Sequence, residues 1–474
     1  VESSARPLGK REQRLCRIGN FDRSAVTTEP VGLAGEVGNR TVRTGRADEL
    51  VAVALGHDRH EELAGHRRPR VERGAVELDV GSDQAATDSG GSFGCTNPHE
   101  RRRYRGPMTD ERFDHERIHL VVLFGGESAE HDVSCTTAAH VLRAADPQRY
   151  RITPVGISTE GQWALAQEAV EALIEGPHAV PGRLNPIGTD VSPTPMLADA
   201  ASSDEVTVVL PLLHGPMGED GTVQGLLDLA NVAYVGSGVL GSAVAMDKAM
   251  AKQVLAAAGI PQARYRAFAE HEMAPGMPGE LADELGLPVF VKPANMGSSV
   301  GVSKASTVEA LRAAIDHALT YDEMIVVEEA IAGREIEVAV LGNTSPESSL
   351  PGEIVPGEEF YSYDDKYVTD GAQLLIPAPL PETVAADVRR LAIDTFRALR
   401  CDGLARVDFF YEIDDEGNGR GLLCNEVNTM PGFTPISMYP KLWIHSGMSY
   451  SALIDRLVDL ALERHARRRR NTKR

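Results

Sequence analysis

Two stretches, GLARVDFFYEI at residues 403–413 and GLLCNEVNTMPG at residues 421–432, decide the fold of this 474-residue chain. Each contains a mostly apolar run long enough for a strand, and DDEGNG separates them at residues 414–419. Apolar runs on either side of a short segment rich in Asp, Asn and Gly predict a β-hairpin. We therefore expect two antiparallel strands, at Leu404–Ile413 and Gly421–Val427.

Polar side chains interrupt both runs. Arg406 and Asp408 lie two residues apart in the first run, as do Glu426 and Asn428 in the second. Since successive side chains of a strand point to opposite faces, each pair shares one face. Pairing of the strands would bring together two carboxylates, an amide and a guanidinium, and Mg²⁺ prefers such oxygen ligands. The hairpin thus predicts a Mg²⁺ site. The alternative, for these strands alone, is a pair with one face in water.

A pattern of alternating strands and helices begins after residue 117. It predicts elements at Ile118–Phe124, Val133–Ala144, Tyr150–Ile157, Glu205–Leu212 and Thr222–Leu229. Glycine-containing loops, at 125–132 and 214–221, connect two of these strands to the helices that follow. Such loops are where α/β folds bind anions and small ligands. The pattern therefore predicts a parallel sheet with a ligand crevice along the carboxyl ends of its strands.

Later segments contain lysines and small residues suited to phosphate. The expected strands and helices here are Met246–Gly259, Pro288–Lys292, Val300–Lys304, Val308–Leu319, 326–345 and Glu382–Leu399. Lys292 ends a strand and precedes the Gly/Ser-rich loop 297–301, whose small residues let backbone N–H groups approach phosphate oxygens. Lys248 lies just inside a helix. Taken alone, such a lysine is usually a solvated surface residue.

Acidic and aromatic residues complete the candidate nucleotide site. Glu328 and Glu335 lie at strand ends, where carboxylates can accept from a purine amino group and from ribose hydroxyls. The loop 360–367 contains four aromatic residues and would close over a site and exclude water. Solvated strand ends and a surface loop are the simpler interpretations of these two segments.

Composition excludes several classes of protein. The chain is 42% hydrophobic and 25% charged, as in ordinary globular proteins, and we find no apolar run of membrane-spanning length. Its net charge of −21 argues against nucleic acid as a partner. The five cysteines include no Cys-x-x-Cys pair, which predicts neither disulfides nor a zinc site and favours the cytoplasm.

Residues 1–107 differ from the rest. They contain 18 Lys and Arg against 16 Asp and Glu, whereas the remainder holds 30 against 53. They show no sustained strand or helix period, and we expect a disordered or non-native leader with Met108 as the first residue of the folded protein. The alternative is a basic arm at Arg101–Arg105 that contacts nucleic acid. A second basic segment, 466–474, is expected to be a frayed tail.

Taken together, these motifs resemble those of the D-alanine–D-alanine ligases. The likeness rests on Phe124–Glu130, His214–Gly225, Met246–Lys248, Val291–Pro293, Gly297–Gly301, Lys366–Tyr367, Arg406–Asp408 and Glu426–Gly432. It implies an ATP-grasp fold that combines α/β and α+β parts, with a Rossmann-like parallel-sheet domain at the N-terminus. The implied limits are 108–240 for that substrate domain and 241–328 and 329–465 for two subdomains that clasp ATP.

The resemblance also implies a reaction and residue roles. ATP would phosphorylate one D-alanine, and the amine of a second would displace the phosphate. The implied roles are ATP binding by Lys248, Lys292, Ser299, Glu328, Glu335 and Lys366, binding of two Mg²⁺ or Mn²⁺ by Asp408, Glu426 and Asn428, substrate binding by Glu130, His214, Arg406, Ser437 and Met438, and catalysis by Glu130, Ser298, Tyr367, Arg406 and Gly432.

The substrate and the partners follow from the same likeness. The Lys-Tyr pair at 366–367 distinguishes the chain from depsipeptide-forming relatives and favours an amine nucleophile, whereas D-serine stays open as second substrate. A different ATP-grasp carboxylate–amine ligase and a nucleotide-binding regulator without turnover stay open as well. Relatives are usually homodimers, and dependence on a monovalent cation is left open.

Overall fold

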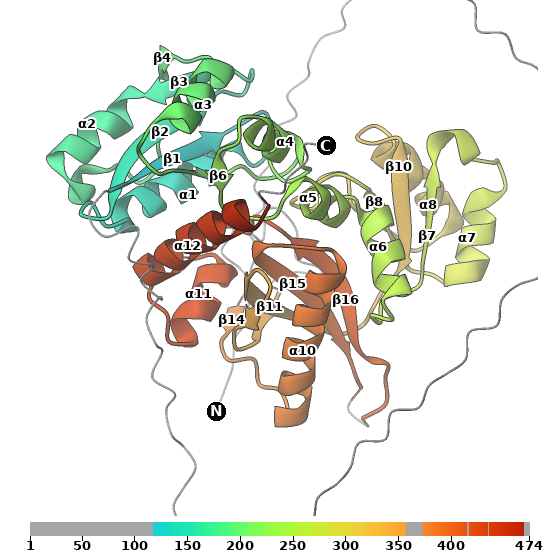
Figure 1. Cartoon of the computed structure of the whole chain (residues 1–474). Coiled ribbons are helices and arrows are strands. Elements are labelled where there is room, and N and C mark those ends of the chain that lie inside the picture. Colours follow the sequence, from blue (N-terminus) through green and yellow to red (C-terminus); the bar gives the residue numbers. More distant parts are fainter. Residues whose placement is uncertain (1–116, 357–372, 415–416, 435, 469–474) are drawn as a thin grey trace, which may run out of the picture. The chain divides into compact units, whose positions relative to one another are not determined.

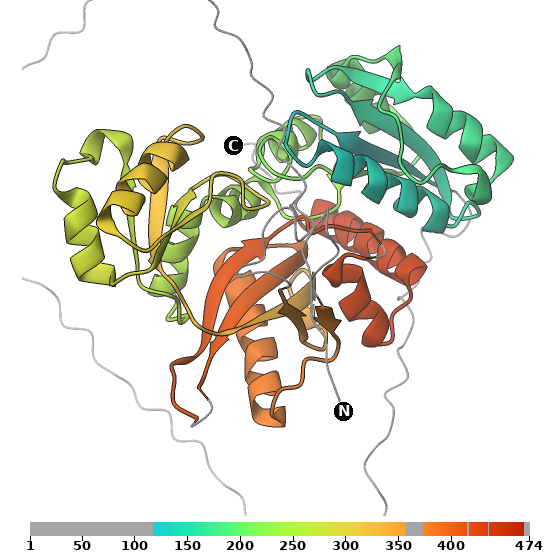
Figure 2. The same cartoon turned by 180° about the vertical axis from the view of Figure 1, so that it is seen from behind.

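The computed structural model describes residues 117–356, 373–414, 417–434 and 436–468. All of them belong to one unit of the chain, Glu100–Arg474. The segments predicted as a leader (1–107) and as the aromatic loop (360–367), with Lys366 and Tyr367, lie outside the described residues. Within the described ranges the strands form three sheets (Figures 1 and 2).

The first sheet has six strands in the order β4-β3-β2-β1-β5-β6. Its strands are β1 (Ile118–Gly125), β2 (Tyr150–Ile157), β3 (Trp163–Ala166), β4 (Gly188–Asp190), β5 (Thr207–Pro211) and β6 (Ala233–Tyr234). Strands β2, β1, β5 and β6 pair in parallel, as predicted, whereas β3 and β4 are antiparallel additions. The helices between them are α1 (His131–Ala144), α2 (Gln167–Glu175), α3 (Pro193–Ser202) and α4 (Thr222–Leu229).

Alternate side chains of β1 enter two different cores. Leu120 and Val122 pack with α1 and with α12 (Tyr450–Arg468), whereas Val121 and Leu123 pack with α3 and α4. A strand buried on both faces must be apolar throughout, which explains the run LVVLF at residues 120–124. The buried central strand holds its carboxyl end, and the loop after it, in a fixed place.

The second sheet has four antiparallel strands in the order β7-β10-β8-β9. They are β7 (Tyr265–Ala269), β8 (Val289–Pro293), β9 (Ser303–Ala305) and β10 (Met324–Glu329), covered by α7 (Met277–Leu285) and α8 (Val308–Ala318). Strand β9 begins three residues later than predicted, because Ser298, Ser299 and Gly301 have positive φ angles and keep the chain in a loop. Two helices precede this sheet, α5 (Val239–Met246) and α6 (Lys248–Ala257).

The third sheet contains the predicted hairpin. Its strands are β11 (Arg334–Gly342), β12 (Glu347–Ser348), β13 (Gly352–Val355), β14 (Gln373–Leu375), β15 (Gly403–Glu412) and β16 (Gly421–Asn428), with β15 and β16 paired antiparallel. Helices α10 (Glu382–Ala398) and α11 (Met438–His445) pack on it together with α12. Short 3₁₀ turns occur at Pro177–Ala179 and Glu270–Glu272.

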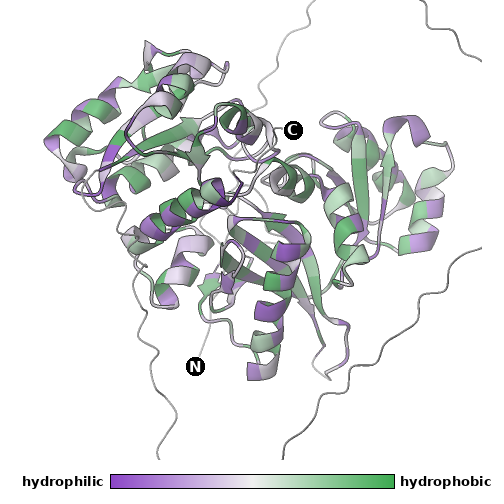
Figure 3. Ribbon diagram, viewed as in Figure 1, coloured by the Kyte–Doolittle hydropathy of each residue, from purple (hydrophilic) through white to green (hydrophobic). Residues whose placement is uncertain are grey.

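Helices α10 and α12 are amphipathic, and both polar and apolar residues run along each of them (Figure 3). In α10 the buried residues Val388, Ala392 and Phe396 recur every four residues, as one face of a helix requires. Helix α12 extends to Arg468, so it includes the start of the predicted basic tail; Arg467 and Arg468 pair with Asp402 and Asp228. None of the helices in the described ranges is both long enough and apolar enough to span a membrane.

Candidate active site

One cavity has walls from the second and third sheets. Its lining includes Lys248, Lys292, Ser298, Ser299, Glu335, Arg406, Asp408, Glu426 and Asn428. The predicted phosphate-binding lysines and the predicted hairpin carboxylates therefore face the same space. Glu219, Glu337 and Asn425, which were not predicted, line it as well.

The hairpin brings its four polar residues together. The strand register pairs Asp408 with Glu426 and Arg406 with Asn428, so the two pairs share one sheet face as predicted. Arg406 donates to both oxygens of Asp408, and Asn428 Nδ2 donates to Asp408 Oδ2 at 3.0 Å. Glu337, on the neighbouring strand β11, forms a 3.0 Å ion pair with Arg406. Arg406 is thus held by acidic groups of two strands.

A bulge in β16 changes which side chains reach the cavity. The register shifts between Asp408 and Phe409, so that Phe409 pairs with Cys424 and Asn425 is skipped in the strand pairing. Both Asn425 and Glu426 consequently line the cavity, although strict alternation places them on opposite faces. Asn425 Oδ1 accepts a hydrogen bond from Lys292 Nζ at 3.3 Å. The sequence has no signal for this residue, because a bulge depends on the pairing of two strands.

The donor set fits a hard divalent cation. Asp408 and Glu426 are opposite each other, with the Asn428 amide one position along the face. Two carboxylates and an amide oxygen are suitable Mg²⁺ ligands, with phosphate oxygens completing the coordination. Among the described residues no group of three or more His, Cys, Asp or Glu side chains has metal-binding geometry.

Lysines border the cavity on the side of the second sheet. Lys248 is the first residue of α6, and the N-cap Asp247 accepts a hydrogen bond from Met250 N. The Nζ atom of Lys248 donates a hydrogen bond to Met296 O at 2.6 Å. Burial lowers the pKa of Lys248, and the charge of Lys292 lowers it further, whereas the Glu426 carboxylate opposes the shift. A partly desolvated ammonium ion next to a second one attracts an anion such as phosphate.

Glu328 lies beneath these lysines and is not among the cavity-lining residues. It accepts from Lys292 at 3.2 Å and forms an ion pair at 3.3 Å with Lys252, a buried lysine that was not predicted as a site residue. Burial raises the pKa of Glu328, but the two lysines outweigh it and the pKa lies below the ordinary value. In this structure the Glu328 carboxylate orients lysines.

The Gly/Ser loop contacts the loop after β1. Ser298 Oγ donates to Glu130 Oε1 at 2.5 Å. A Cβ atom on Gly297 would lie 2.9 Å from Glu130 Oε2, so a side chain at this position would collide with that carboxylate. Glu130, which immediately precedes α1, is thereby brought next to the cavity from the first sheet.

A second loop of the first sheet binds the chain just after β16. His214, which is buried, donates from Nδ1 to Met430 O at 2.9 Å, and its Nε2 has no hydrogen-bond partner in the described part of the chain. Glu219 accepts from Gly215 N at 2.8 Å and from Met430 N at 3.0 Å. Burial, reinforced by the charge of Glu130, raises the pKa of Glu219 to about 8.

Three predicted residues lie farther along the chain. Gly432 approaches Ser437, whose Oγ would be 2.9 Å from a Cβ on that glycine and accepts from Thr434 N at 3.1 Å. Ser437 is the N-cap of α11 and Met438 its first residue. These residues, with Glu130 and His214, are not in the lining of the cavity that holds the lysines.

The sequence of this chain matches known protein families in two regions. Residues 119–237 match the family described as D-ala D-ala ligase N-terminus, and residues 254–459 match D-ala D-ala ligase C-terminus. A D-alanine–D-alanine ligase of Shouchella clausii is 47% identical over 355 residues, covering 73% of this chain and 95% of the relative. The chain belongs to the D-alanine–D-alanine ligase family.

Solved structures of this ligase family agree. The D-alanine–D-alanine ligase of Coxiella burnetii has a TM-score of 0.62 and 35% identity, over 74% of this chain and 96% of that chain. The VanG D-Ala:D-Ser ligase of Enterococcus faecalis has a TM-score of 0.62 and 32% identity, over 73% of this chain and 100% of that chain. The predicted family and the ATP-grasp fold are confirmed.

Proposed function

We propose that the chain uses ATP to join two D-alanine molecules into D-alanyl-D-alanine for peptidoglycan synthesis. Membership of the ligase family supports this reaction, since relatives with that name align over 95% of their length. The structural observation that carries the proposal is the shared cavity of Lys248 and Lys292 with Asp408 and Glu426. A phosphate-binding wall that faces a cation-binding wall is what carboxylate activation by ATP needs.

The proposed reaction has two steps. A carboxylate oxygen of the first D-alanine attacks the γ-phosphorus of ATP, the bond to the β-phosphate oxygen breaks, and ADP leaves with its electrons. The amine nitrogen of the second D-alanine then attacks the carbonyl carbon of the acyl phosphate, inorganic phosphate leaves, and the nitrogen loses a proton. Both steps build negative charge on oxygen, which cations and N–H donors stabilise.

The proposed nucleotide site combines both walls. Lys248, Lys292 and Ser299 would bind the phosphates, together with Lys366. Glu335, which lines the cavity, and Glu328, whose carboxylate also holds Lys292 and Lys252, would bind the ribose and adenine ends. Asp408, Glu426 and Asn428 would hold two Mg²⁺ or Mn²⁺ ions, which neutralise phosphate charge when bound. The contact of Lys292 with Asn425 supports a site that spans the two sheets.

The proposed substrate site lies between this cavity and the first sheet. Glu130 would bind the ammonium group of the first D-alanine beside His214, and Arg406 with the Gly432 N–H would stabilise the tetrahedral oxyanion. Ser437 and the Met438 backbone would bind the carboxylate of the second substrate. The bond from Ser298 to Glu130 supports a hydrogen-bonded group that Tyr367 would complete.

A second candidate is ligation of D-alanine to D-serine. It is favoured by the likeness to the VanG D-Ala:D-Ser ligase, which covers the whole of that chain. D-serine differs from D-alanine only by a hydroxyl group in place of a hydrogen atom, so a pocket of slightly different shape accepts it. Both substrates therefore need testing.

The decisive measurement is phosphate release from ATP and Mg²⁺ with D-alanine alone, compared with L-alanine, D-alanine plus D-serine, and D-alanine plus D-lactate, with products separated by chromatography. We expect release and D-alanyl-D-alanine with D-alanine alone. Release that requires D-serine would favour the second candidate. ATP binding without any D-alanine-dependent release would contradict both.

We also infer a cytoplasmic homodimer, because the substrates are cytoplasmic metabolites and family members usually pair.

A further inference from the structure

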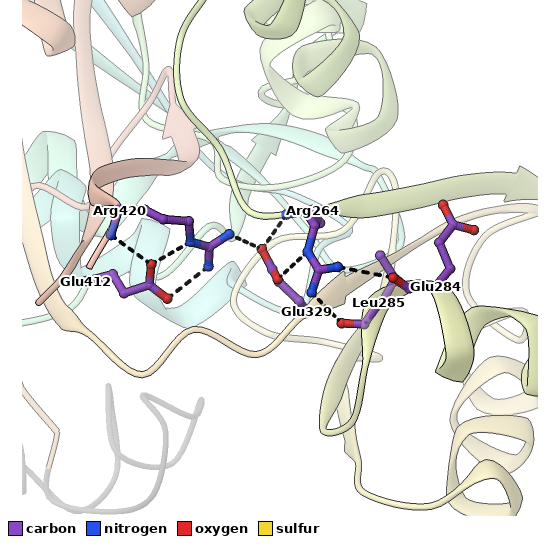
Figure 4. Close-up of polar contacts among 6 residues, drawn as sticks. All are labelled: Arg264, Glu284, Leu285, Glu329, Glu412 and Arg420. Atoms are coloured by element: carbon purple, nitrogen blue, oxygen red, sulfur yellow. Dashed lines mark hydrogen bonds and ion pairs between the residues drawn. The ribbon is translucent and has the colours of Figure 1, made fainter. Parts of the chain in front are cut away.

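Outside the cavity, a chain of ion pairs connects the second and third sheets (Figure 4). Its centre is Glu329, the last residue of β10, whose side chain is only 9% exposed. Glu329 Oε1 accepts from Arg264 N at 2.7 Å and from Arg420 Nη1 at 2.5 Å, and Oε2 accepts from Arg264 Nε at 2.7 Å. One carboxylate therefore receives three charge-assisted or backbone hydrogen bonds.

Each arginine is anchored at its own end. Arg420, which precedes β16, donates from Nε and Nη2 to the two oxygens of Glu412 on β15, at 2.5 and 2.9 Å. Arg264, which precedes β7, donates to the carbonyl oxygens of Glu284 and Leu285 at the end of α7. Paired donors fix the plane of a guanidinium, so both arginines hold Glu329 in a defined position. Glu329, Arg264, Arg420 and Glu412 are called the clamp below.

The clamp and the cavity are joined by one strand. Glu328 and Glu329 are neighbours on β10, and successive side chains of a strand point to opposite faces. Glu328 contacts Lys292 and Lys252, whereas Glu329 contacts the clamp arginines. A displacement of Glu329 would therefore move Glu328 and, with it, Lys292, which lines the cavity.

The same segment is tied to β16 a second time. Cys424 N donates to Pro261 O at 2.8 Å, and Gln262 forms a parallel bridge with Cys424. Residues 261–264 thus run along the strand that carries Asn425 and Glu426. The bond between Lys292 and Asn425 spans the two sheets inside the cavity, and the clamp spans them outside.

We propose that the clamp is a positioning device for ATP, in which Arg420 sets the distance between the lysine wall and the carboxylate wall of the cavity. This inference rests on the proposed function of the cavity as the ATP site. None of the four clamp residues lines the cavity, and the clamp acts through Lys292 and Glu426, which do. Partly exposed ion pairs contribute little to folding, so its main effect falls on nucleotide affinity rather than on stability.

The test compares Arg420→Ala with Arg390→Ala. Arg390 is a matched control, because it also forms two ion pairs, with Asp387 and Asp394, but lies on α10 with 60% of its side chain exposed. Binding of a non-hydrolysable ATP analogue with Mg²⁺ is measured by calorimetry, and KM and kcat by phosphate release. We expect Arg420→Ala to raise both the dissociation constant and the KM for ATP by about three- to tenfold, with the KM for D-alanine unchanged. Arg390→Ala should behave as wild type.

Three further measurements separate positioning from a structural role. Arg420→Lys keeps the charge but cannot donate to Glu412 and Glu329 in the same geometry, so it should restore only part of the affinity. The difference between wild type and Arg420→Ala should shrink as KCl rises from about 0.05 to about 0.5 M, because salt screens the exposed pairs. The double variant Glu329→Gln with Arg420→Ala should raise the dissociation constant of the ATP analogue by a smaller factor than the product of the factors for the two single variants.

The outcomes distinguish the clamp from the proposed function. If wild type releases phosphate normally but Arg420→Ala binds the analogue as well as wild type does, the clamp proposal is wrong and the proposed function stands. Equal losses in Arg420→Ala and Arg390→Ala would also overturn the clamp, as would a lower melting temperature with unchanged KM for ATP. Absence of D-alanine-dependent turnover in wild type would instead refute the proposed function.

Discussion

Arg406 donates two hydrogen bonds to Asp408, from Nε to Oδ1 at 2.8 Å and from Nη2 to Oδ2 at 2.7 Å. The two residues are separated by one position on β15, so the pair keeps the guanidinium plane fixed against the sheet. Glu337 adds an ion pair from β11. A planar, five-donor group held in this way would suit the proposed role of Arg406 in stabilising the oxyanion.

Arg406→Lys should therefore lower kcat about 100- to 1000-fold, the loss typical for removal of an oxyanion donor. The KM for ATP should change by less than about threefold, since the lysines of the other wall remain. Steady-state phosphate release at saturating D-alanine is the measurement. A variant with normal kcat and a raised KM for ATP would show that Arg406 binds nucleotide instead.

Glu130→Gln should weaken binding of the first D-alanine. The carboxylate would lose its charge towards the substrate ammonium group, whereas its contact with Ser298 can be kept by the amide oxygen. We expect a rise in the KM for D-alanine of about tenfold or more, with analogue binding nearly unchanged. Equal losses of D-alanine and ATP affinity would contradict the assigned role.

Gly297→Ala tests the closeness of the Gly/Ser loop to Glu130. The added Cβ would be 2.9 Å from Glu130 Oε2, so either the loop or the carboxylate must shift. We expect an increase in the KM for D-alanine with little change in melting temperature. Gly225→Ala, on α4, is the control, because its Cβ would meet no atom within 4 Å. Similar kinetics for the two variants would rule out the contact.

Glu219 predicts a pH dependence of stability. Its pKa in the folded protein is raised from 4.5 to about 8, so the folded state binds a proton more tightly than the unfolded state does. The bound proton adds its full contribution to the free energy of unfolding when the pH is below the ordinary pKa of 4.5. This contribution is lost as the pH rises through about 8. Urea unfolding at pH 6 and pH 8.5 should show a smaller pH difference for Glu219→Gln than for wild type. An equal difference in both would show that other groups cause the pH dependence.

Removal of residues 1–107 should leave turnover intact. The described site residues begin at Glu130, and the family matches begin at residue 119. Phosphate release by the truncated and full-length chains, compared at equal concentration, is the measurement. A truncated protein that folds, by circular dichroism, but has lost activity would show that residues 1–107 take part in function.

Local patterns predicted much of this fold. Alternation in the two hairpin runs placed Arg406 and Asp408 on one face of the first strand and Glu426 and Asn428 on one face of the second, because period 2 is a property of the strand itself. The run at 118–124 predicted β1 for a different reason, since a strand buried on both faces is apolar throughout. Elements between 163 and 202 were not predicted, since β3, β4 and α3 are short and depend on packing against the parallel strands.

The missed site residues share a physical cause. Asn425 reaches the cavity through a bulge that only strand pairing creates. Glu337 lies within the apolar β11 and Lys252 within α6, and each is buried against a partner that is distant in sequence, Arg406 and Glu328. Such pairs depend on tertiary structure. The roles of Lys366 and Tyr367 stay predictions, because both lie outside the described residues.

The two main-chain polar groups of Met430 join two of the sheets. Its N–H is held by Glu219 and its carbonyl oxygen by His214, both from the loop after β5. The first and third sheets are thereby joined through buried bonds, whereas the second sheet is joined to the third partly through Arg420, whose side chain is 41% exposed. We therefore expect that, when substrates enter and products leave, the second sheet moves relative to the first and third sheets, which stay together.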